Sequence, residues 1–254
     1  MTRFALITGI SFLVVACGGG GESGGAAAGG AAAAADDGPR GTATITGTIK
    51  FSGTPPTNPP IDMAEEAACQ AKHPGGVVNE QVVVTNGMLS NAFVYVKAGP
   101  PVGASYAAPA TPVSIDQDGC VYHPRVFGAM VNQPIEIKNS DPVLHNIKAV
   151  PTANRGFNIS QPTEGMTTTR TFSTPEVMVP LECNVHGWMN AFVGVVSHPF
   201  FAVSGADGSF TISGLPAGTY ELEAWHEKLG TRTVSVTVTD GGSATAEITF
   251  GPAA

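Results

Sequence analysis

The chain has 254 residues, a formal net charge of −8, and only 13% charged residues against 43% hydrophobic ones. This balance argues against nucleic acid as a partner, because proteins that bind it carry clusters of lysine and arginine. The length allows one or two domains. The 32 glycines and 20 prolines favour strands and turns over long helices.

The first 17 residues have the features of a bacterial export signal. Arg3 precedes an apolar stretch over residues 4–15, which is too short to span a membrane. Small residues then lead to Cys17, a pattern that resembles the lipobox of bacterial lipoproteins. The resemblance implies a lipid on the Cys17 thiol, which would anchor the protein in the cell envelope, facing the periplasm or in the outer membrane. The alternative is ordinary signal cleavage with an incidental cysteine.

Residues 18–41 are almost entirely glycine and alanine. Such a segment lacks the large apolar side chains of a core, so we predict a disordered tether. A flexible chain of this length has a root-mean-square span of roughly 25–30 Å.

Short apolar and alternating runs then predict roughly a dozen strands. The clearest run is residues 42–51, where Ile45, Ile49 and Phe51 share one face. Residues 61–72 are the best candidate for a helix. Strands are predicted over residues 42–51, 81–85, 92–97, 112–115, 130–138, 145–150, 167–172, 177–181, 191–197, 200–203, 209–213, 219–225, 234–238 and 244–250. The pattern predicts an all-β protein built from β-sandwiches.

The cysteines at positions 17, 69, 120 and 183 are expected to be in different chemical states. In an oxidising compartment, lipidation of Cys17 leaves an odd number of thiols. Pairing Cys69 with Cys120 leaves Cys183 free and closes a loop of about 50 residues, worth about 3–4 kcal/mol. The alternatives are that Cys69 and Cys120 are reduced and buried, or that one of them pairs with Cys183.

Cys183 opens the densest ligand motif of the chain. Two residues separate Cys183 from His186, two more separate His186 from Met189, and His145 lies upstream. A thiolate and two imidazoles with a weak axial thioether suit both Cu(I) and Cu(II). We therefore predict one type 1 copper ion held by His145, Cys183, His186 and Met189. A zinc site on the same residues and a metal-free sandwich are the alternatives.

This motif is similar to the short ligand loop of plastocyanin-like and amicyanin-like cupredoxins, including the aromatic Trp188 before the methionine. Residues 135–146 resemble the strand and loop that carry the first histidine of that family. The resemblance implies a Greek-key cupredoxin β-sandwich over residues 104–199. It also implies that Asn139 ties the two ligand loops together by hydrogen bonds. Asn184, beside the cysteine, stands where the family usually has threonine or serine.

Residues 207–220 resemble the hairpin of the transthyretin-like, carboxypeptidase-regulatory-type β-sandwich. Residues 45–51 and 92–96 look like the first strands of that family. We therefore expect a discontinuous module of residues 42–103 and 200–254, with the cupredoxin domain inserted. The alternatives are two tandem domains or one fused sandwich. Related modules bind sugars, but Tyr220 and Trp225 are expected to be core residues here.

Electron transfer is the function that the resemblance to cupredoxins implies. The protein would exchange single electrons with a transient redox protein through an apolar patch of Pro142, Val143, Leu144, Gly187 and Trp188. A structural or carbohydrate-binding surface lipoprotein and a copper storage or delivery protein are the alternatives. We expect no catalytic residues and no enzyme, because four protein ligands leave no open position on the metal.

Four further histidines lie outside the motif. They are His73, His123, His198 and His226. His123 and His198 are expected to be hydrogen-bonded structural residues. A role beside the metal is the alternative for His123 and His198, and a separate metal site over residues 225–227 is the alternative for His226.

Overall fold

The computed structural model describes residues 38–251, which contain eighteen strands and one short helix. This confirms the all-β fold class. The predicted export signal, the lipidation of Cys17 and most of the tether lie outside the described residues. Within residues 38–251, no helix is long and apolar enough to cross a membrane.

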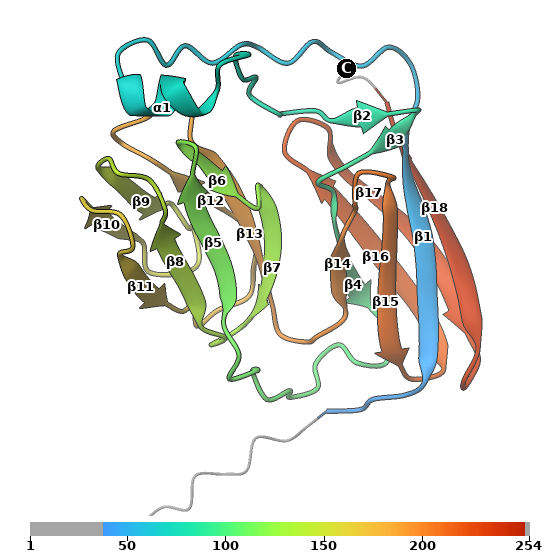
Figure 1. Ribbon diagram of the computed structural model, residues 1–254. Helices are drawn as coiled ribbons and strands as arrows, with labels where there is room; N and C mark the ends of the chain where they lie inside the picture. The colour runs from blue at the N-terminus through green and yellow to red at the C-terminus, as the bar shows by residue number, and fades with distance from the viewer. Residues whose placement is uncertain (1–37, 252–254) are drawn as a thin grey trace, which may run out of the picture. The chain divides into compact units, whose positions relative to one another are not determined.

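The elements form four sheets, labelled in Figure 1. In chain order they are β1 (Ala43–Phe51), α1 (Ala67–Lys72), β2 (Val84–Thr85), β3 (Met88–Leu89), β4 (Phe93–Ala98), β5 (Val113–Asp118), β6 (Val121–His123), β7 (Val126–Met130), β8 (Ile135–Asn139), β9 (His145–Ala149), β10 (Phe157–Gln161), β11 (Thr167–Arg170), β12 (Glu176–Glu182), β13 (Asn190–Val196), β14 (Phe201–Val203), β15 (Ser209–Leu215), β16 (Gly218–His226), β17 (Gly230–Val238) and β18 (Ser243–Phe250).

The first pair of sheets combines strands from both ends of the described chain. Strand β1 pairs antiparallel with β15 and parallel with β18, and it lies between them in Figure 1. The other sheet of this pair has the order β14-β4-β16-β17. Strands that precede residues 104–199 therefore share sheets with strands that follow them. The expected boundaries of the two domains stay a prediction.

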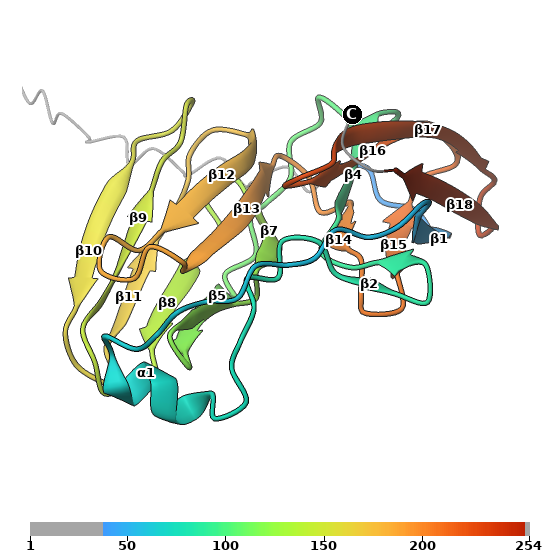
Figure 2. The ribbon, with the colours of Figure 1, turned by 90° about the horizontal axis from the view of Figure 1, so that it is seen from above.

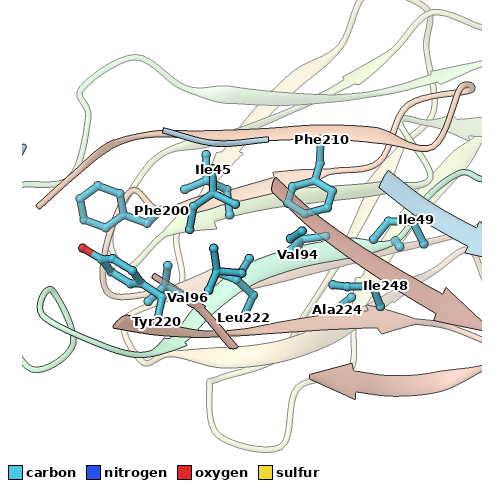
Figure 3. Close-up of a cluster of buried hydrophobic side chains, with 14 of the residues drawn as sticks. Ile45, Ile49, Val94, Val96, Phe200, Phe210, Tyr220, Leu222, Ala224 and Ile248 are labelled. Carbon is cyan, nitrogen blue, oxygen red and sulfur yellow. The ribbon is translucent and has the colours of Figure 1, made fainter. Parts of the chain in front are cut away.

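The core of this first sandwich follows from strand alternation, and Figure 3 shows its side chains. Ile45, Ile49 and Phe51 point into it, as predicted, because alternate residues of a strand face the same side. Gly47 lies on the same face, where a Cβ atom would approach Phe210 Cζ to 2.2 Å. A larger residue at position 47 would therefore displace the Phe210 ring. Tyr220 is fully buried, as expected for a core residue.

The second sandwich carries the predicted ligands. Its sheets have the orders β10-β9-β12-β13-β7 and β11-β8-β5-β6. Side chains from both sheets form one buried cluster, which includes Ile115 and Ile137 from one sheet and Ile147 and Leu181 from the other. Strand β9 pairs with β12, so the chain that leaves β12 runs beside the start of β9. This pairing positions the candidate metal centre.

Several predicted elements differ in extent. Residues 130–138 are not one strand, because a turn at Asn132 (φ +65°) separates β7 from β8. The predicted helix over residues 61–72 is confined to α1. Its first part turns instead, because the Asp62 carboxylate accepts a hydrogen bond from the Ala64 amide at 3.0 Å, a local bond that competes with helix formation. Strands β3, β6 and β10 were not predicted, and of β7 only Met130 fell in a predicted range.

The two sandwiches meet at Phe93 on β4. Gly128 on β7 and Gly194 on β13 are neighbours in parallel register, and together they accommodate the Phe93 ring. A Cβ atom at either glycine would lie within 2.7 Å of a ring carbon of Phe93. An ion pair between Arg125 and Glu227, with Nη2 and Oε2 3.0 Å apart, lies at the same junction. The junction is therefore apolar at its centre, with a paired charge beside it.

His226 provides the first testable prediction, on pH and stability. Burial, followed by the charge of Arg125, lowers the pKa of His226 from 6.5 to about 4. Between these values the unfolded chain binds a proton at His226 that the folded chain does not. The contribution of His226 to the free energy of unfolding is therefore fully present above pH 6.5 and is lost as the pH falls towards 4. We expect this residue to remove about 3 kcal/mol from the free energy of unfolding by pH 4.

Urea denaturation of wild type and His226→Gln between pH 7 and pH 4 measures this effect. The pH dependence of the His226→Gln variant is expected to be shallower by that amount, and His123→Gln, at an exposed histidine, is the control for the loss of one histidine. Parallel pH profiles for wild type and His226→Gln would contradict the prediction.

Candidate metal centre

The four predicted ligands all lie at one end of the second sandwich. His145 is the first residue of β9, and the other three lie in the loop between β12 and β13. Two backbone hydrogen bonds close this loop, from the Met189 amide to the His186 carbonyl at 2.9 Å and from the Cys183 amide to the Met189 carbonyl at 3.2 Å. The loop is therefore a compact turn, and all four side chains are buried.

Three of the predicted ligands come together. One ligand atom from each of His145, Cys183 and His186 lies within 4.8 Å of the other two. The Nδ1 atoms of the two histidines are 2.9 Å apart. Zinc–nitrogen bonds in proteins, for comparison, are about 2.0–2.1 Å long, so both nitrogens are close enough to bind one ion. Met189 belongs to the same buried cluster as Cys183, and its axial role stays a prediction.

Cys183 is a buried free thiol with an unusually low pKa. Burial alone would raise the pKa, but hydrogen bonds with His145, His186 and backbone amides lower it to about 5. One of these bonds comes from the His186 amide, 3.3 Å from Sγ. A pKa lowered in this way favours the thiolate form at neutral pH, which is the form that binds metals.

Asp141 holds His145 from the side opposite the thiolate. Asp141 Oδ2 is 2.9 Å from His145 Nε2, and the carboxylate also accepts bonds from the amides of Gly119 at 2.9 Å and Cys120 at 2.7 Å. Lys72 Nζ lies 2.7 Å from Asp141 Oδ1. Burial raises the pKa of Asp141, but the bonds from His145, Lys72 and the two amides outweigh it and hold the pKa well below its usual range.

The contacts of Asp141 determine which nitrogen of His145 carries the proton. The position of that proton decides whether His145 can bind a metal. An amide and an ammonium group can only donate, so the Asp141 carboxylate is an acceptor and is ionised. His145 Nε2 must then carry a proton and donate it to Asp141. The Nδ1 lone pair is left facing His186 and the thiolate, as metal ligation requires. The donor set therefore suits a soft or borderline metal ion such as copper.

The prediction that Asn139 links the two ligand loops by hydrogen bonds is wrong. The Asn139 amide group donates to the carbonyls of Val143 and Gln161, both at 3.0 Å, which keeps it away from the cysteine loop. Asn146 makes the link instead, because its Oδ1 accepts a bond from the Asn184 backbone amide at 2.6 Å. Continuing the β9–β12 register beyond Glu182 and Lys148 places these two residues opposite each other, whereas Asn139 lies in the other sheet.

A disulfide bond between Cys69 and Cys120 fixes α1 beside the centre. Cys120 belongs to the turn between β5 and β6, where both Gly119 and Cys120 have positive φ, as a two-residue hairpin turn requires. The Cys120 carbonyl accepts a hydrogen bond from Trp188 Nε1 at 2.9 Å. The same turn therefore contacts α1, Asp141 and the ligand loop. Figure 2 shows α1 beside the ends of β5 and β8.

The remaining histidines lie outside this cluster. His73 Nε2 is 2.6 Å from the Gly119 carbonyl, and His198 Nε2 is 2.8 Å from the Val96 carbonyl. Among the described residues, the two groups that could hold a metal both contain His145. The second of these groups uses Cys120, whose sulfur is already bonded to Cys69.

The surface over the ligand loops is partly apolar. Leu144, beside His145, is 43% exposed, and Val185, beside His186, is 47% exposed. Of the patch predicted from the sequence, Pro142 and Gly187 are also exposed, whereas Val143 and Trp188 are half-buried. Val185 was not part of the predicted patch, although its position beside a ligand was a usable signal.

Fold and site together define a β-sandwich protein with a buried cluster of one thiolate and two imidazoles. A family model described as the carboxypeptidase regulatory-like domain matches residues 189–251. That match includes the hairpin of residues 207–220 and begins inside the stretch predicted to be cupredoxin. No curated protein matches the chain.

Several solved structures show weak similarity, and three of them are a nitrite reductase, a purple cupredoxin and an amicyanin mutant. A copper-containing nitrite reductase from Thermus scotoductus is 21% identical over 38% of this chain and 25% of its own, with a TM-score of 0.31. A purple cupredoxin from Nitrosopumilus maritimus is 20% identical over 33% of this chain and 98% of its own, with a TM-score of 0.29. A methionine-to-alanine mutant of amicyanin, Cu(I), is 16% identical over 33% of this chain and 81% of its own, with a TM-score of 0.30. This chain spans a quarter of the nitrite reductase.

Proposed function

We propose that this protein binds one type 1 copper ion and carries single electrons between redox partners, held at the bacterial envelope by a lipid on Cys17. The observation that carries the proposal is the buried cluster of the Cys183 thiolate and the Nδ1 atoms of His145 and His186. Copper bound there supplies a one-electron Cu(II)/Cu(I) couple. The Met189 thioether completes the proposed ligand set.

The protein's own residues prepare this site in four ways. Asp141 fixes the tautomer of His145, and Asn146 holds the start of the cysteine loop. All four proposed ligands are buried, and four protein ligands would leave no open position for a substrate, which favours a carrier over an enzyme. Leu144 and Val185 provide exposed apolar contacts for a transient partner, whose interface is expected to be small.

Metal analysis and an optical spectrum of the purified full-length protein test the proposal. We expect about one copper per chain and a strong visible absorption band in the Cu(II) form, since thiolate ligation of this kind defines blue copper sites. Cys183→Ser is expected to abolish the band, whereas His123→Gln, at an exposed histidine outside the cluster, should keep it. A wild type that binds copper tightly but stays colourless, or that retains only zinc, would overturn the proposal.

A structural or carbohydrate-binding role is the second candidate, favoured by the match of residues 189–251 to the carboxypeptidase regulatory-like domain. The aromatic residues predicted from the sequence give it little support, because Tyr220 is buried and Trp225 packs against Phe192 with ring centres 5.1 Å apart. Glycan binding that is retained in Cys183→Ser would support this role.

A further inference from the structure

Asp141 is a buried carboxylate that the ligand motif did not predict. Its side chain is 1% exposed, and a charged group at such a position is stable only when it is fully paired. The structure provides that pairing from three separate segments: the amides of Gly119 and Cys120, the ammonium of Lys72, and the ring of His145. The carboxylate is therefore held rigidly beside one proposed ligand.

This contact affects both the orientation and the basicity of His145. A carboxylate that accepts the second N–H of a ligand imidazole fixes the ring and makes its other nitrogen a stronger donor. A stronger donor and a nearby negative charge both favour the more highly charged metal ion. If copper is bound, Asp141 would therefore stabilise Cu(II) relative to Cu(I).

Lys72 acts in the opposite direction. Its ammonium lies 2.7 Å from an oxygen of Asp141 and 2.7 Å from one of Asp118, and it belongs to α1, which the Cys69–Cys120 disulfide joins to the turn beside Asp141. A positive charge at this position offsets part of the Asp141 charge. Lys72, which is far from the ligand loop in the sequence, thus contributes to the electrostatics of the metal centre.

We propose that Asp141 is a positioning residue that lowers the reduction potential of the bound copper through His145, and that Lys72 of α1 opposes it. This inference rests on the proposed function, since it concerns the same copper site. It assigns to Asp141 and Lys72, neither of which is a proposed ligand, an influence on the potential that acts through the proposed ligand His145.

Redox titration of the visible band in three full-length variants tests the inference. Asp141→Asn keeps the size of the side chain and removes its charge, and we expect the preference for Cu(II) over Cu(I) to fall about tenfold. A tenfold change raises a one-electron potential by about 59 mV. Lys72→Met is expected to shift the potential the other way. Asp118→Asn is the matched control, because it loses the same charge and the same lysine partner, but it is exposed and does not contact His145.

Nitrogen NMR of the His145 ring in the metal-free protein gives a second readout that needs no copper. The wild type is expected to be protonated at Nε2 with a strong hydrogen bond, and Asp141→Asn is expected to weaken that bond. A purely structural role would lower stability or copper content without opposite shifts in Asp141→Asn and Lys72→Met.

The two proposals fail in different ways. If the band is present but the potentials of Asp141→Asn and Asp118→Asn shift equally, the inference is wrong and the proposed function stands. If the wild type has no band, the proposed function fails. In that case the NMR measurement still decides whether Asp141 holds His145, and a Nε2 without a proton would overturn the inference by itself.

Discussion

Replacing both Cys69 and Cys120 by serine is expected to lower the free energy of unfolding by about 4 kcal/mol. The two cysteines are 51 residues apart, and their bond removes the entropy of that open loop from the unfolded chain. The variant also releases α1 from the turn that contacts Asp141. Urea denaturation of the metal-free proteins, with the midpoint and slope compared, measures the loss.

Cys183→Ser is the control for the disulfide variant. It also removes a buried cysteine sulfur, but it breaks no covalent bond between segments. Its effect on the metal-free protein is expected to be well below that of the double variant. A loss of less than about 1 kcal/mol in the double variant would show that the disulfide does not constrain the unfolded chain as this entropy estimate requires.

Phe93→Ala is expected to cost about 3–5 kcal/mol, the usual range for removing a fully buried aromatic side chain. The ring lies against Gly128 and Gly194, and the Phe201 ring centre is 5.6 Å away. Its loss leaves a cavity at the junction of the two sandwiches. Thermal or urea unfolding gives the magnitude. Phe201→Ala, at a half-buried neighbour, is the matched control and should cost less.

Gly194→Ala tests the same contact from the other side. The added methyl would approach Phe93 Cζ to 2.4 Å, so the substitution is expected to destabilise the wild type. In the Phe93→Ala background the methyl has room, and the same substitution should cost much less. Equal costs in the two backgrounds, in a double-mutant cycle, would mean that Gly194 and Phe93 do not interact.

The sequence predicted those parts of the molecule that depend on short-range patterns. Alternation identified β1 with its inward Ile45 and Ile49, and the spacing of Cys183, His186 and Met189 identified one end of the second sandwich as the candidate site. The prediction of one strand over residues 130–138 was wrong, because the chain turns at Asn132, which adopts positive φ although it is not a glycine.

Long-range contacts could not be predicted in this way. Asp141 resembled an ordinary turn residue, and its role depends on Lys72 and Cys120, which reach it only through the disulfide and the β5–β6 turn. The prediction that Asn139 links the ligand loops was wrong, because the link depends on which sheet each asparagine occupies. Strand order, and not local sequence, decides it.

The pairing of β1 with β18 has a consequence for biosynthesis. Thr44 pairs with Ser243, so the ribosome must add about 200 residues before that partner strand exists. At a rate of synthesis of about 5–20 residues per second, one edge of β1 stays without its β18 partner for roughly 10–40 s. The first sandwich therefore cannot close until nearly the whole described chain is present.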